Sequence, residues 1–62
     1  MKNSFPDLDS WSREVIQMLI RSGYDNYMAE RLTDQWLEDC PEEWNCTTPD
    51  QAAEQIKEAD CH

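Results

Sequence analysis

Basic side chains are scarce in this sequence, and their scarcity excludes one large class of function. The chain has 62 residues, of which only five are lysine or arginine while 14 are aspartate or glutamate, for a formal net charge of −9. A protein that binds nucleic acid directly needs a basic face to meet the phosphates. An anionic membrane surface repels the same negative charge. We therefore expect no direct contact with nucleic acid or with a membrane.

Long apolar runs are also lacking. The longest apolar cluster covers residues 15–20 and is interrupted by Gln17, whereas a membrane-spanning helix needs about 20 apolar residues. Residues 1–7 contain one lysine and no apolar segment of the kind that a secretory signal peptide carries. These features predict a cytoplasmic location.

The sequence has a single histidine, His62, at its last position. Nucleophilic catalysis needs a base that is held in place, and chain ends are poorly held. A catalytic carboxylate pair needs an apolar pocket that shifts one pKa, for which so short a chain offers little room. We therefore expect no enzyme activity, no catalytic residue and no cofactor.

The three cysteines are Cys40, Cys46 and Cys61. An odd number without a secretory signal favours free thiols. Zinc sites usually place two ligands two to four residues apart, a spacing that Cys40 and Cys46 do not have. We expect no metal site and interpret Cys40 and Cys46 as small, buried apolar residues. A disulfide and a zinc-stapled module, with Cys61 and His62 as further ligands, are the alternatives.

The first third of the chain predicts an amphipathic helix. Its apolar side chains recur every three or four residues, as one face of a helix requires. They are Leu8, Trp11, Val15, Ile16, Leu19 and Ile20. Residues 4–7 form a capping pattern at its start, and Asp9 or Ser10 is an alternative start.

A second helix is predicted directly after the first. The only glycine, Gly23, should end the first helix in a left-handed conformation, with Tyr24 folding back onto Leu19. Asp25 caps the second helix, and Cys40–Pro41 ends it because the residue before a proline avoids helical angles. The apolar positions of this helix are Met28, Ala29, Leu32, Trp36, Leu37 and Cys40. The short turn predicts that the two helices pack as a hairpin or a corner.

A third helix follows a connector over residues 41–46, which we expect to form one helical turn beginning at Pro41. Thr48, Pro49 and Gln51 form a start signal, with threonine as the cap. The helix continues to about Ala59, and its apolar face is thin: Ala52, Ala53, Ile56 and Ala59. The prediction is a small all-α, three-helix domain over residues 1–62, because no segment alternates with the period of a strand.

One known family shares part of this pattern. The Gly23–Tyr24 dipeptide, then Ala29 and Leu32, then an alanine-rich last helix resemble ubiquitin-associated (UBA-type) three-helix domains, which carry a Gly-Phe or Gly-Tyr turn between their first two helices. The resemblance covers about half of the chain, and it implies compact helical packing rather than ubiquitin binding. The connector with Pro41 and Trp44 departs from the short loop usual in that family.

Acidic residues concentrate in the second half of the chain, where nine of them follow Thr33 and only Lys57 offsets them. Two sets occur at steps of four residues, which places carboxylates roughly 6 Å apart along one edge of a helix. One set lies in the second predicted helix (Glu30, Asp34 and Glu38) and the other in the third (Asp50, Glu54 and Glu58). Like charges at this spacing destabilise a helix by roughly 0.2–0.5 kcal/mol per pair.

Two interpretations of this charge compete. One is a solvated face that keeps the protein soluble. The other is an anionic surface for a cationic partner, with a carboxylate spacing comparable to that of nucleic-acid phosphates and a field that speeds encounter. The near absence of offsetting cations favours the second interpretation. The candidate partner-binding residues are Glu30, Asp34, Glu38, Asp39, Glu42, Glu43, Trp44, Asp50, Glu54 and Glu58.

We therefore expect a non-catalytic acidic module that binds a basic protein surface. Its concrete form is an inhibitor or nucleic-acid mimic that occupies the groove of a nucleic-acid-binding protein. Small acidic phage and mobile-element proteins, anti-CRISPR proteins among them, provide the analogy of size and charge. The alternative is a helical adaptor or homodimer that uses apolar faces, because the third helix is too thin to cover two apolar stripes. Trp36 and Trp11 are expected in the core, and Trp44 is either a lid over it or an exposed anchor.

Overall fold

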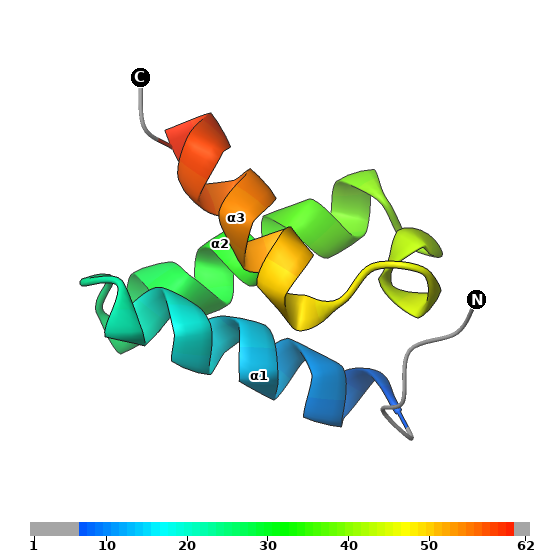
Figure 1. Ribbon diagram of the computed structural model, residues 1–62, viewed down its shortest axis with the longest axis horizontal. Coiled ribbons are helices and arrows are strands. Elements are labelled where there is room, and N and C mark those ends of the chain that lie inside the picture. The colour runs from blue at the N-terminus through cyan, green and yellow to red at the C-terminus, as the bar shows by residue number, and fades with distance from the viewer. Residues whose placement is uncertain (1–6, 61–62) are drawn as a thin grey trace.

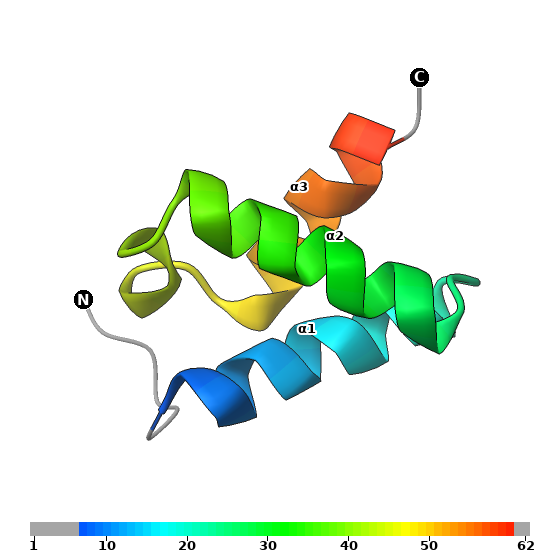
Figure 2. The ribbon, with the colours of Figure 1, turned by 180° about the vertical axis from the view of Figure 1, so that it is seen from behind.

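The computed structural model describes residues 7–60. Three helices make up the fold: α1 (Leu8–Arg21), α2 (Asn26–Asp39) and α3 (Pro49–Asp60), with the short 3₁₀ turn η1 (Glu43–Asn45) between the last two. Within the described residues there is no strand, and the predicted small all-α, three-helix fold is confirmed. α1 and α2 run in roughly opposite directions as a hairpin, and α3 crosses them (Figure 1). Figure 2 shows the same arrangement from behind, with α2 in front.

α1 begins after Asp7, whose Oδ1 accepts a hydrogen bond from the Ser10 backbone N–H at 2.9 Å. The predicted pattern placed Asp7 in the first turn, three residues after Ser4, and this is wrong, because Asp7 has an extended backbone with a φ of −153° and is itself the cap. Ser4 lies outside the described residues. The alternative start at Asp9 or Ser10 is wrong, since both lie inside the helix. The Asp7 side chain is already well placed to satisfy an unpaired N–H of the first turn.

The turn between α1 and α2 forms as predicted. Gly23 has a φ of +115°, and its N–H donates to the carbonyl of Ile20. The Tyr24 N–H folds back to the Leu19 carbonyl at 3.1 Å, which completes the pair of bonds that closes a helix with a left-handed residue. Asp25 then caps α2 by accepting from the Met28 N–H at 2.7 Å.

The connector differs from the prediction in one respect. The helical turn begins at Glu43 and not at Pro41. The Glu43 N–H donates to the Cys40 carbonyl at 3.2 Å, so Pro41 occupies the second position of a β-turn, where its fixed φ is favoured. α3 begins as predicted, because the Thr48 hydroxyl accepts from the Gln51 N–H at 3.2 Å.

The core is built mainly by α1. Trp11, Val15 and Leu19 are fully buried, and they meet three alanines and one isoleucine from the other two helices. These are Ala29 of α2 and Ala52, Ala53 and Ile56 of α3. The Trp11 indole N–H donates to the Thr47 carbonyl at 2.9 Å, which fixes the segment that leads into α3. Of the two tryptophans predicted in the core, Trp11 is fully buried there.

Several residues predicted on apolar faces are not buried. Trp36 packs against Trp11, with ring centroids 5.4 Å apart, but it stays partly exposed at the edge of the core. Cys46 is exposed and Cys40 only half-buried, so the interpretation of both as buried residues is wrong. The apolar positions that face solvent are Leu8, Ile20, Met28 and Ala59. A domain with one small core has room inside for only part of each predicted stripe.

Candidate protein-binding surface

All 14 carboxylates of the chain lie within the described residues and are exposed. Five of them have a partner: Asp7 and Asp25 cap helices, Glu30 accepts from Asn26, Asp60 accepts from the Tyr24 hydroxyl, and Glu54 pairs with Lys57. The other nine make no hydrogen bond or ion pair within residues 7–60. Their charge is therefore directed at solvent or at another molecule.

Each set of acidic residues at steps of four lies on its own helix, and we call them the α2 ladder (Glu30, Asp34 and Glu38) and the α3 ladder (Asp50, Glu54 and Glu58). The three members of the α2 ladder are exposed along α2, and no ion pair offsets them within the described chain. The α3 ladder is partly neutralised, because the Lys57 Nζ lies 3.6 Å from a Glu54 carboxylate oxygen. Lys57 also donates to the Ser22 hydroxyl at 3.2 Å, which ties α3 to the end of α1.

The two ladders do not merge into one anionic face. Successive residues of a helix are rotated by about 100°, and the side of α2 that meets α3 is marked by Trp36, whose indole N–H donates to Gln55 of α3 at 3.1 Å. All three members of the α2 ladder lie about 120° or more around the helix from Trp36. The α3 ladder is likewise rotated by about 100° or more from Ala59, which lines the same open hollow as Leu32 and Trp36 of α2. Each ladder therefore lies on the side of its helix that is turned away from the other helix.

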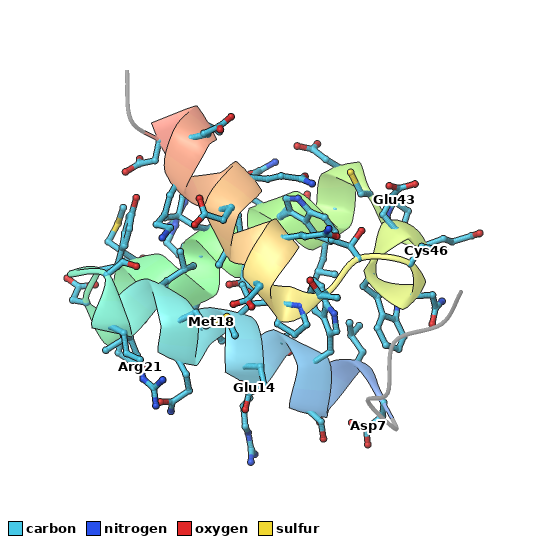
Figure 3. The ribbon with its side chains drawn as sticks, viewed as in Figure 1. Asp7, Glu14, Met18, Arg21, Glu43 and Cys46 are labelled. Carbon is cyan, nitrogen blue, oxygen red and sulfur yellow. The ribbon has the colours of Figure 1, made fainter. Side chains whose placement is uncertain are left out.

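The remaining candidate residues lie at the end of α2 and in the connector. Asp39, Glu42 and Glu43 are exposed, and Figure 3 shows Glu43 beside Cys46 at the connector. Trp44 is half-buried and packs against the core, with its ring centroid 6.1 Å from that of Trp11. This contact matches the interpretation of Trp44 as a lid. Glu14 and Arg21 project from α1 along the lower edge of the same view (Figure 3).

One feature that the sequence reasoning did not find is an apolar groove between α2 and α3. It has a volume of about 210 Å³ and is open to solvent. Its lining residues are Leu32, Gln35, Trp36, Asp39, Gln55, Ile56, Ala59 and Asp60. The available signal was the series Met28, Leu32 and Trp36, at steps of four residues, opposite a third helix rich in alanine.

The groove continues along the surface of α2. A second open hollow, of about 430 Å³, shares Leu32 and Gln35 with the groove and extends to Tyr27 and Met28. Tyr27 is 66% exposed and Met28 39% exposed. Arg31 is the cation on this stretch; it lies over the Tyr27 ring at 5.7 Å and donates to the Tyr27 hydroxyl. We call the groove and the hollow together the α2 groove.

No group of three or more histidine, cysteine or acidic side chains among residues 7–60 is arranged to hold a metal ion. Cys40 and Cys46 are free thiols, while Cys61 and His62 lie outside the described residues. None of the helices in the described part is long and apolar enough to cross a membrane. Comparison with models of known protein families, with characterised proteins and with solved structures finds no match.

Proposed function

We propose that this protein is a non-catalytic acidic module that binds a basic surface of another protein. The observation that carries this proposal is the set of nine exposed carboxylates without a partner in residues 7–60. Self-repulsion among them lowers the stability of an already small domain. A basic partner relieves this repulsion, and the anionic field speeds its approach.

The specific partner that we infer is a nucleic-acid-binding protein, whose groove this protein occupies. The carboxylates of the α2 ladder follow one another at roughly 6 Å, a spacing similar to that of phosphates along a strand. Because the two ladders lie on different sides of the molecule, a single groove contacts the α2 ladder with Asp39, Glu42 and Glu43, or it contacts the α3 ladder. We assign the larger role in partner binding to the α2 ladder with Asp39, Glu42 and Glu43, because Lys57 offsets part of the charge of the α3 ladder.

Co-purification from the native cells tests this proposal. The tagged protein is used as bait at about 50 mM and about 500 mM salt, because screening weakens exposed charge pairs over this range. The captured protein is identified and its binding is measured again with purified components. We expect a basic partner whose affinity falls steeply with salt, and a partner bound equally well at both concentrations contradicts the proposal.

Matched charge variants locate the surface. Asp34→Asn with Glu38→Gln removes two charges from the α2 ladder, and Asp9→Asn with Glu14→Gln removes two from α1. Neither Asp9 nor Glu14 has a side-chain partner in the described part. We expect the α2 variant to weaken binding of the purified partner at least tenfold and the α1 variant to change it less than twofold. Equal effects of the two variants contradict the assignment to the α2 ladder.

A second candidate function is a helical adaptor or homodimer that uses an apolar face. The observation that favours it is the exposed α2 groove, since contiguous apolar surface on a small protein often marks an interaction site. Sedimentation separates the two candidates. A stable dimer whose mass does not change with salt favours the homodimer, and a monomer favours the acidic module.

A further inference from the structure

The shape of the α2 groove suits the binding of a helix better than the binding of a small molecule. Small-molecule sites are usually concave enough to bury most of the ligand, whereas both parts of this groove are open to solvent. From Tyr27 to Asp39 the surface extends along α2 for roughly 18 Å, the length of about three helical turns. An amphipathic helix that lies in such a groove places apolar side chains at every third or fourth residue along it.

The charges at the edge of the groove favour a partner helix with basic flanks. Asp39 lies at its edge on α2, and Asp60 lies at its edge on α3. The other carboxylates of α2 and α3 belong to the two ladders and lie on the sides of these helices turned away from the groove, so Asp39 and Asp60 form its anionic rim, while Arg31 lies toward its Tyr27 end. A helix with lysine or arginine beside its apolar face complements this rim, and a helix with acidic flanks is repelled by it.

The same charge argues against a second copy of this chain as the occupant. Each copy carries a formal net charge of −9, so pairing two α2 grooves brings like charges together. Interfaces that place like charges opposite one another are disfavoured. The apolar lining alone would allow self-association, and charge complementarity is what separates the two occupants.

We propose that the α2 groove binds a basic amphipathic helix of the partner protein, with the apolar face of that helix against Leu32 and Trp36 and its cations beside Asp39 and Asp60. The inference rests on the proposed function, because it assigns a binding mode to the basic partner. It adds that apolar contact, and not charge alone, holds that partner.

A synthetic peptide of about 18 residues, long enough to become helical when bound, is the direct probe. It carries leucine at positions i, i+3, i+4 and i+7 and lysine on its flanks. Two matched peptides accompany it: one with glutamate in place of lysine, and one with alanine in place of leucine. We expect the leucine–lysine peptide to bind the intact protein at least tenfold more tightly than either of the other two.

Nuclear magnetic resonance of the ¹⁵N-labelled protein locates the peptide. The Trp36 indole N–H and the Gln55 side-chain amide lie at the groove, and their signals should move on titration. The Trp11 indole N–H, which is buried and donates to Thr47, should move much less and is the internal control. If the signals that move belong to α1 or to the connector instead, the α2 groove is not the binding site.

Two variants test the apolar and charged contributions separately. Ala59→Gln places a longer polar side chain in the groove at an exposed position, so the fold should survive while peptide affinity falls at least tenfold. Asp39→Asn with Asp60→Asn removes the rim charge and leaves an amide oxygen to accept from Tyr24. This pair should weaken binding about threefold to tenfold at low salt, and Asp9→Asn with Glu14→Gln should change it less than twofold.

Some outcomes contradict the binding of a basic helix in the α2 groove and leave the proposed function unaffected. Equal binding by the glutamate peptide removes the charge argument, and unchanged binding by Ala59→Gln removes the groove. A Trp36 signal that shifts with protein concentration in the absence of peptide identifies a second copy as the occupant. The proposed function fails on a different result: a native partner whose affinity is insensitive to salt and to neutralisation of the α2 ladder.

Discussion

α1 and α2 are both 14 residues long, both start at an aspartate cap, and both carry apolar side chains at helical spacing. They use those side chains differently. α1 buries Trp11, Val15 and Leu19, whereas the fully buried residues of α2 are only Ala29 and Thr33. The larger apolar side chains of α2 lie at the edge of the core or face solvent. α1 therefore stabilises the fold, and α2 leaves apolar surface available to another molecule.

The charges of the two helices follow the same division. α1 carries two acidic and two basic residues, and α2 carries four acidic residues and one arginine. Neutral balance suits a helix whose role is packing. The excess of carboxylates on α2 lowers the stability of that helix and is consistent with a surface that meets a cationic partner. Four experiments test this comparison.

Removing the largest core side chain should have the greatest effect. Trp11→Ala deletes a fully buried indole that contacts Trp36 and Trp44. We expect a loss of about 3–5 kcal/mol in the free energy of unfolding, enough to leave much of the protein unfolded at 25 °C because small domains have little stability in reserve. Urea denaturation followed by circular dichroism measures it. Trp11→Phe, which keeps an aromatic ring and removes the hydrogen bond to Thr47, should cost less.

The same substitution in both helices tests the comparison directly. Leu19→Ala removes a fully buried side chain from α1, and we expect it to cost about 2–5 kcal/mol. Leu32→Ala removes a partly exposed side chain of α2, and we expect about 1 kcal/mol because less apolar area leaves the core. Thermal unfolding of the two variants compares them. Equal losses of stability would contradict the division of roles between α1 and α2.

Adding a single methyl group in the turn that joins α1 and α2 should lower the free energy of unfolding. Gly23 has a φ of +115°, and a Cβ atom added there meets nothing within 4 Å. Gly23→Ala therefore introduces backbone strain without a clash, and we expect it to cost about 1–2 kcal/mol. Gly23→Asn should cost less, since asparagine tolerates left-handed conformations better. Denaturant unfolding of both variants provides the comparison, and a neutral Gly23→Ala would show that the turn relaxes.

The smallest expected effect has the opposite sign. Asp34 lies one turn from both Glu30 and Glu38, so Asp34→Asn relieves two like-charge pairs and should stabilise the protein by roughly 0.2–0.5 kcal/mol per pair at low salt. Glu14→Gln in α1 is the control, because no carboxylate lies one turn away from Glu14. The stability of this variant should equal that of the unsubstituted protein. A gain that persists in about 1 M salt would not be electrostatic.

The local signals of the sequence predicted local structure well. Asp25, Gly23 and Thr48 each act through hydrogen bonds to residues within five positions along the chain, so the sequence alone specifies their partners. The predicted turn at Pro41 was wrong because proline fits the second position of a β-turn as well as the first turn of a helix. Which of the two forms here depends on the hydrogen bond between Glu43 and Cys40.

The candidate surface was only partly predictable for a different reason. Steps of four residues place the α2 ladder along one edge of its helix, and exposure of these carboxylates follows from the cost of burying charge. The direction in which that edge points depends on how α2 is rotated against α1 and α3. Likewise, Cys46 and Met28 resemble core residues in the sequence and face solvent in the fold.

The sequence by itself determined the three helices, the caps of α2 and α3, the turn at Gly23 and the excess of negative charge, because each depends on residue type and on neighbours a few positions away. Only the tertiary structure decided that the two acidic ladders point away from each other and that an apolar groove opens between α2 and α3. The physical reason is limited interior space: one small core holds Trp11, Val15 and Leu19 of α1, and the apolar side chains of α2 that do not fit beside them lie at the surface.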